Sequence, residues 1–147
     1  MAVLERIAYE QLNARQKENY NFQKLAAVLA DYGFNCLRLT DDWKGADFIA
    51  CHVDGQTFLR VQLKGRLSFD RKYQGKNIHM AFPDGGHFYL YPHDDVLEKA
   101  LVLGLMKGTD SWESEGAYHF PKLSQALLDL LRPYRLECVP YPQDSDK

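Results

Sequence analysis

Apolar and polar positions change their spacing at Gly33, which separates a helical start from a strand-rich middle. Over residues 14–32 the apolar side chains recur every three or four positions, which is the spacing of an amphipathic helix. Gly33 follows this segment as a C-terminal cap. A shorter helix is predicted over residues 3–12, with Asn13 between the two. The chain is therefore expected to begin with two helices.

Short runs rich in β-forming residues follow Gly33. The first three are FNCLRLT, ADFIACHV and QTFLRVQLKG, and Asp54-Gly55 lies between the second and the third. Asp-Gly between two such runs is a strong signal for a tight hairpin turn. Two further runs, KNIHMAF and HFYLYP, flank PDGG and predict a second hairpin. We expect these strands to form one sheet.

The remaining pattern predicts helices that cover this sheet. HDDVLEKALVLGL and FPKLSQALLDLLRPY have helical spacing, and RLECVPY predicts a final edge strand. This order of elements is typical of the α/β or α+β class, with a mixed sheet flanked by helices. No linker interrupts the pattern, so we expect a single domain over residues 1–141 and a flexible polar tail over 142–147.

Composition places the chain among globular proteins of the cytoplasm. Its 147 residues are enough for one core, and 46% of them are hydrophobic. No apolar run is long enough to span a bilayer, and the N-terminal residues lack the apolar centre of a signal peptide. The three cysteines, Cys36, Cys51 and Cys138, lie in apolar stretches without a CxxC pair, which favours buried free thiols.

The net charge and the distribution of charge give opposite indications about nucleic-acid binding. The net charge of -2 and the pI near 6.2 lack the overall basic character of a dedicated DNA-binding domain. Residues 64–76 nevertheless concentrate basic side chains. One interpretation is that this segment grips phosphates and that an aromatic ring stacks on a base; the other is a solvated loop. The predicted nucleic-acid-binding residues are Arg66, Arg71, Lys72, Tyr73 and Lys76.

The first hairpin brings together three side chains that suit phosphodiester chemistry. A turn at Asp54-Gly55 sets a register in which Asp47 lies opposite Gln62, and Lys64 projects from the same face as Gln62. Asp47 and the amide oxygen of Gln62 could hold Mg²⁺ or Mn²⁺, while Lys64 orients water or stabilises developing charge. A neutral amide binds such an ion less strongly than a carboxylate.

GADFIA, the Asp-Gly turn and FLRVQLKGR resemble the core hairpin of the PD-(D/E)xK superfamily, which includes many restriction endonucleases and Holliday-junction resolvases. Asp47 matches its first acidic residue, Lys64 its lysine, and Gln62 stands where Asp or Glu is usual. The resemblance implies a restriction-endonuclease-like fold, metal-dependent cleavage of DNA, a bacterial origin and a homodimer. It also implies an acidic residue from the first long helix, for which Glu18 is the nearest carboxylate, with Asn21 and Gln23 as polar alternatives.

Two other hypotheses are compatible with the sequence. The chain could be a catalytically degenerate member of the same fold that binds nucleic acid or a protein partner, with Gln62 as the mark of a lost metal site. It could also be an unrelated α/β domain in which the D…QxK spacing is coincidence. The sequence contains no P-loop, G-x-G-x-x-G or G-x-S-x-G motif and no zinc-type histidine spacing, so a nucleotide cofactor is not expected.

Overall fold

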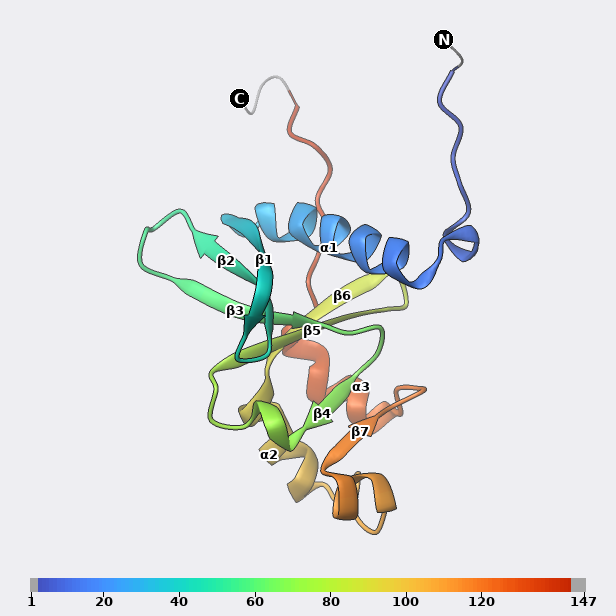
Figure 1. The fold of residues 1–147 in the computed structure, drawn as a ribbon, viewed down its shortest axis with the longest axis vertical. Helices are drawn as coiled ribbons and strands as arrows, with labels where there is room; N and C mark the ends of the chain where they lie inside the picture. The colour runs from blue at the N-terminus through green and yellow to red at the C-terminus, as the bar shows by residue number, and fades with distance from the viewer. Residues whose placement is uncertain (1–2, 144–147) are drawn as a thin grey trace.

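The computed structural model describes residues 3–143, and a five-stranded mixed sheet lies at its centre (Figure 1). The strands are ordered β1-β2-β3-β5-β6, and every neighbouring pair is antiparallel except β3 and β5, which are parallel. The mixed α and β class predicted from the sequence is confirmed. The bounds of these strands are β1 (Phe34–Trp43), β2 (Ala46–His52), β3 (Phe58–Leu63), β5 (Ile78–Asp84) and β6 (His87–Pro92).

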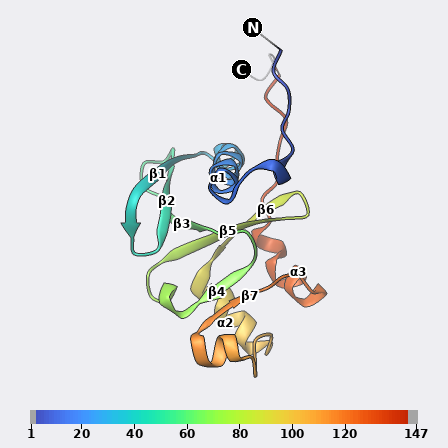
Figure 2. The ribbon, with the colours of Figure 1, turned by 45° about the vertical axis from the view of Figure 1, so that its right-hand side comes forward.

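Helices cover both faces of this sheet. The long helix α1 (Ala14–Ala30) lies on one side, and α2 (His93–Val102) and α3 (Gln125–Leu131) lie on the other (Figures 1 and 2). The core beneath α1 joins its buried leucines to β2, β3 and β5, and the core on the opposite face joins β5 and β6 to α2 and α3. The sheet therefore separates two hydrophobic clusters.

The helix predicted before Gly33 is confirmed, and its ends have clear local causes. The Asn13 side chain accepts a hydrogen bond from the Gln16 N–H, and the Gln16 side chain accepts one from the Asn13 N–H, which is a capping box. At the other end Gly33 has a φ of +85°, and a Cβ there would lie 2.9 Å from His52 Nε2. Glycine is thus needed where the chain turns from α1 into β1.

The predicted helix over residues 3–12 is wrong. Only a three-residue 3₁₀ helix forms there, at Tyr9–Gln11. Val3, Leu4 and Ile7 are exposed, so no neighbouring element buries the apolar side of a helix. An isolated helix of this length is marginal in water, which explains why the local pattern is not realised.

The register predicted for the first hairpin is confirmed, although its turn is longer than expected. Phe48 pairs with Val61, and Ala50 pairs with Leu59. The His52 N–H donates to the Thr57 carbonyl oxygen at 2.9 Å, which leaves four residues in the connection. The Asp54 carboxylate accepts hydrogen bonds from the backbone N–H groups of Gln56 and Thr57, both at 2.8 Å. These bonds stabilise the wider turn.

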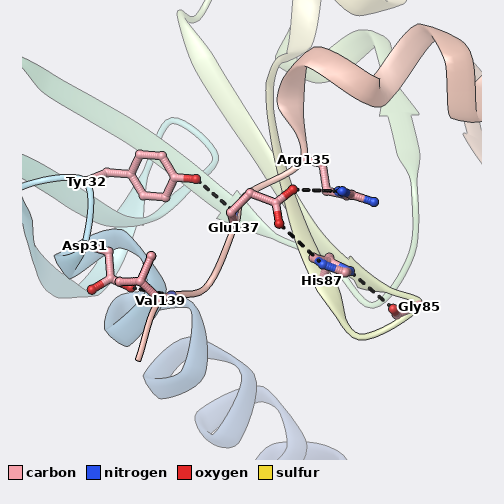
Figure 3. Close-up of polar contacts among 7 residues, drawn as sticks. All are labelled: Asp31, Tyr32, Gly85, His87, Arg135, Glu137 and Val139. Atoms are coloured by element: carbon pink, nitrogen blue, oxygen red, sulfur yellow. Dashed lines mark hydrogen bonds and ion pairs between the residues drawn. The ribbon is translucent and has the colours of Figure 1, made fainter. Parts of the chain in front are cut away.

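The second predicted hairpin is confirmed, but the final edge strand is not. Arg135 makes a single bridge to Tyr89 at the edge of β6. Beyond it the chain crosses to the end of α1, where the Glu137 N–H donates to the Tyr32 hydroxyl at 2.8 Å (Figure 3). The Glu137 carboxylate also lies 2.9 Å from Arg135 and 3.7 Å from His87. The segment therefore stays beside β6, where the Leu136 N–H donates to the Phe88 carbonyl oxygen at 2.8 Å, but its pairing with β6 is limited to the one bridge.

A second, two-stranded sheet was not predicted. It consists of β4 (Ser68–Asp70) and β7 (Ala117–His119), which pair antiparallel on the α2 side of the molecule. β4 lies within the basic segment 64–76, so part of that segment is a fixed strand and not a solvated loop. A π-helix (Ser111–Glu115) leads into β7, and its Trp112 is buried in the core shared with α2.

The three cysteines are free thiols, as expected, but they differ in exposure. Cys36 and Cys51 are partly buried, and burial raises the pKa of the Cys36 thiol to about 11, which makes it a poor nucleophile. Cys138 is exposed on the C-terminal segment, which corrects the expectation that it is buried. Among residues 3–143 no helix is both long and apolar enough to pass through a bilayer.

Candidate active site

A pocket of about 460 Å³ lies where α1 faces the ends of β2 and β3. Asp47, Gln62, Lys64 and Glu18 all line it. These four residues come from α1, β2, β3 and the position directly after β3, and they are the ones for which a catalytic role was predicted. The structure therefore brings the predicted cluster together at one site.

Asp47 is placed at the point where β2 and β3 separate. Phe48 and Val61 form the last ladder pair between the two strands, and Asp47 and Gln62 lie one step beyond it. There the Leu63 N–H donates to the Asp47 carboxylate at 2.9 Å, while the ladder of β3 continues with β5. The carboxylate thus takes the place of a backbone acceptor and is fixed at the strand end.

The surroundings of Asp47 favour its protonated form more than those of an ordinary surface carboxyl do. Removal of solvent by the surrounding protein raises the pKa of Asp47, and the Leu63 N–H and the charges of Lys64 and Arg38 only partly offset this effect. Glu18 raises the pKa further by charge repulsion. Two carboxylates that repel each other beside a solvent-accessible pocket form an environment in which a bound cation would be favourable.

Lys64 lies between this pocket and a second one. Its backbone N–H donates to the Ala81 carbonyl oxygen at 2.8 Å, and its ammonium nitrogen is 5.8 Å from the centre of the Tyr73 ring. Lys64 also lines the neighbouring pocket, together with Arg66 and His119. Its charge influences both Asp47 and His119.

A solved structure is similar to this chain. It is that of Hjc from Archaeoglobus fulgidus, a Holliday junction resolvase from an archaeal hyperthermophile, at 15% identity and a TM-score of 0.38 over 48% of this chain and 74% of that chain. The likeness is too distant to bear on activity, metal or partners. No family model and no curated protein matches the chain.

The pocket also contains residues that were not predicted, among them Tyr9, Lys17 and Arg38. Lys17 could have been found, because it lies four residues before Asn21, which the sequence offered as a polar alternative to Glu18 and which also lines the pocket. Asn21 donates from its side chain to the Tyr9 hydroxyl at 3.0 Å. Arg38 has no such local signal, because its place depends on the pairing of β1 with β2.

The predicted nucleic-acid-binding residues are dispersed. Arg66 is exposed at the second pocket, whereas the guanidinium of Arg71 lies 4.6 Å from the Trp112 ring. Lys72 is 3.8 Å from the Asp70 carboxylate, and Lys76 is half-buried. Tyr73 is only 4% exposed and belongs to the core, so the expectation that its ring stacks on a base is wrong.

The oxygen atoms around the pocket fit a hard divalent ion. Among the side chains that the structure describes, no three of His, Cys, Asp or Glu are grouped as a metal site. The two carboxylates and the Gln62 amide nevertheless provide oxygen donors, and Mg²⁺ typically uses one or two protein carboxylates and keeps several waters. The donor set is therefore compatible with Mg²⁺ or Mn²⁺, with fewer charges than a three-carboxylate site.

The turn that leads into β2 gives a testable account of how Asp47 is positioned. Gly45 has a φ of +94°, and a Cβ there would lie 2.9 Å from two carbons of the Tyr73 ring. We expect Gly45→Ala to lower the free energy of unfolding by about 1–3 kcal/mol or more, because backbone strain adds to the collision. Urea denaturation measures this free energy of unfolding. Gly55→Ala is the matched control, because Gly55 also has positive φ but open space around it. Equal losses for both variants would contradict a specific contact with Tyr73.

Proposed function

We propose that the chain is a metal-dependent endonuclease that hydrolyses DNA phosphodiester bonds in the pocket around Asp47. The observation that carries the proposal is the convergence of Asp47, Gln62, Lys64 and Glu18 on one solvent-accessible pocket. Oxygen donors and cationic side chains meet there, since Lys17 and Arg38 also line it. That combination suits a negatively charged phosphodiester whose cleavage depends on a divalent ion.

In this proposal Asp47 and Gln62 hold Mg²⁺ or Mn²⁺, with Glu18 in support. When bound, the ion would polarise the phosphate and lower the pKa of a nearby water. Asp47 has a defined orientation for this role, because the Leu63 N–H holds its carboxylate. The electrostatic repulsion between Glu18 and Asp47 would be relieved by a cation placed near both.

Lys64 orients the attacking water or stabilises the charge that grows on the phosphate. Its ammonium can act on the phosphate because Lys64 lines the pocket and its backbone is fixed by the bond to Ala81. Arg66, Arg71, Lys72 and Lys76 hold the phosphates of the bound strand, and a homodimer supplies the second cut across a duplex. A cytoplasmic location accords with the free thiols of the chain.

One specific observation favours a second candidate function. Gln62 occupies a position where a carboxylate would bind an ion more strongly, and in the described part of the chain no three acidic, histidine or cysteine side chains form a metal group. A nuclease fold that had lost its metal would retain the pocket and bind nucleic acid or a protein partner. Metal affinity separates the two functions.

Replacing Gln62 with Glu tests the proposal. We expect Gln62→Glu to bind Mn²⁺ at least about tenfold more tightly, because ligand charge controls the affinity of oxygen-donor sites. DNA cleavage should then begin at lower metal concentration. Calorimetric titration with Mn²⁺ gives the affinity, and cleavage of supercoiled plasmid gives the activity.

Gln23→Glu is the matched control for this experiment. It adds the same charge to an exposed position of α1 that does not line the pocket. We expect its Mn²⁺ affinity to equal that of the unmodified protein. If neither the unmodified protein nor Gln62→Glu binds Mn²⁺ or cuts DNA, the binding-module function replaces the nuclease.

A further inference from the structure

A second pocket of about 340 Å³ adjoins the candidate active site. It is lined by Lys64, Gly65, Arg66, Ser68 and His119, and it shares Lys64 and Gly65 with the first pocket. Two pockets with common wall residues can be occupied by successive groups of one extended ligand. The chemistry of the second pocket therefore bears on what the site as a whole binds.

The small sheet gives this pocket a fixed wall. Ser68 and His119 are directly paired across β4 and β7, and the Phe120 N–H donates to the Leu67 carbonyl oxygen at 2.9 Å. The Ser68 carbonyl oxygen accepts a hydrogen bond of 2.6 Å from the buried Tyr91 hydroxyl. Ser68 itself is 2% exposed. The position of His119 is thus set by pairing and burial, although His119 itself is exposed.

The hydrogen bonds of Ser68 determine which nitrogen of His119 remains for a ligand. The Ser68 hydroxyl donates to the Arg66 carbonyl oxygen at 3.0 Å, and its oxygen lies 2.6 Å from His119 Nδ1. Nδ1 of His119 is therefore engaged by the Ser68 hydroxyl, and in the protonated ring, where both nitrogens carry a proton, Nδ1 donates to the Ser68 oxygen while the hydroxyl donates to Arg66. Nε2 is then the ring nitrogen that a ligand can reach, and protonation of His119 makes it a donor.

The charges around His119 are predominantly positive. Desolvation lowers the pKa of His119, and the nearby charges of Lys64, Arg66 and Lys72 lower it further, while Asp70 acts in the opposite direction. Among the acidic side chains that the structure describes, which do not include Asp42, none lies within ion-pair distance of Lys64 or Arg66. A bound anion would supply the missing negative charge and favour the protonated form of His119.

We propose that this second pocket binds the DNA phosphate next to the one that is cleaved, through Lys64, Arg66 and Nε2 of His119. The proposal rests on the proposed function for the identity of the ligand. A guanidinium, an ammonium and an imidazolium together offer charge-assisted donors to phosphate oxygens. Because Lys64 borders both pockets, a strand that crosses it would place successive phosphates in the two sites. Binding would take up a proton at His119.

The test measures binding of fluorescent tetrathymidylate in EDTA by anisotropy at pH 6 and pH 8. The unmodified protein should bind more tightly at pH 6, because protonated His119 donates to the phosphate. Arg66→Ala should weaken binding about tenfold at both pH values, as expected for loss of a charge-assisted contact. His119→Gln should reduce the difference between the two pH values. NMR titration should show that tetrathymidylate raises the pKa of His119.

Two control variants test whether the effects on binding are specific to residues of the pocket. Arg132→Ala removes an exposed arginine that pairs with Asp129, and His87→Gln removes a histidine beside Glu137, both away from the pocket. Each should bind tetrathymidylate like the unmodified protein. Thermal melting of Arg66→Ala and His119→Gln should show that both side chains are dispensable for folding, as their exposure predicts.

The outcomes separate this inference from the nuclease proposal. If Arg66→Ala and His119→Gln bind like the unmodified protein, or if inorganic phosphate raises the pKa of His119 while tetrathymidylate does not, the DNA phosphate subsite is overturned, whatever the cleavage result. If both variants and the NMR shift behave as expected while no metal supports cleavage, the subsite stands and the nuclease proposal fails.

Discussion

Asp47→Asn is expected to slow DNA cleavage by about 10³-fold. The substitution removes the carboxylate that we propose holds the metal ion, and such an ion contributes several kcal/mol to transition-state stabilisation. Single-turnover cleavage of plasmid in Mn²⁺ measures the rate. Asp110→Asn is the matched control, because Asp110 is exposed and makes no side-chain capping bond. A rate within threefold of the unmodified protein, about 0.7 kcal/mol, would contradict the role of Asp47.

The same variant should be at least as stable as the unmodified protein without metal. Folding raises the pKa of Asp47, so its ionised form costs stability at pH values above its folded-state pKa. This cost disappears as the pH falls below the ordinary value of 3.8. Asn removes the charge and retains an oxygen that can accept from Leu63. We therefore expect a higher melting temperature than that of the unmodified protein at pH 7, and the difference should shrink on acidification.

Lys64→Met is expected to reduce cleavage by about 10²–10³-fold while Mn²⁺ binding is retained. Methionine preserves much of the apolar stem beside Tyr73 and removes the charge that we assign to the transition state. Calorimetry and single-turnover rates together distinguish this variant from Asp47→Asn, which should lose both properties. Lys107→Met, at an exposed position outside the pocket, is the control. Unchanged cleavage by Lys64→Met would exclude Lys64 from the chemistry.

The part of the site that could be predicted from sequence lies on the first hairpin. Phe48, Ala50 and Val61 must share a buried face, and side-chain alternation then fixes which residues stand opposite one another. A register error of one residue would have turned the apolar side chains of one of the two strands away from those of the other. The proximity of Asp47, Gln62 and Lys64 follows from this constraint. The turn length was less predictable, because it depends on hydrogen bonds to the Asp54 carboxylate.

Features that depend on contacts distant in sequence could not be predicted. Ser68 and His119 are 51 positions apart, and each belongs to a strand of three residues without a strong β pattern. Arg38 reaches the first pocket only because β1 pairs with β2. At Tyr73 the local pattern gave a wrong prediction. Its basic neighbours suggested an exposed ring, whereas the fold buries it.

The most direct test of the central claim is incubation of the unmodified protein with supercoiled plasmid, linear duplex, branched DNA and single-stranded DNA, in Mg²⁺, Mn²⁺ or EDTA. The pocket around Asp47 predicts cleavage of at least one of these substrates with either metal and no cleavage in EDTA. Cleavage that persists in EDTA, or intact DNA in both metals across a range of concentrations, would contradict a metal-dependent nuclease at this site.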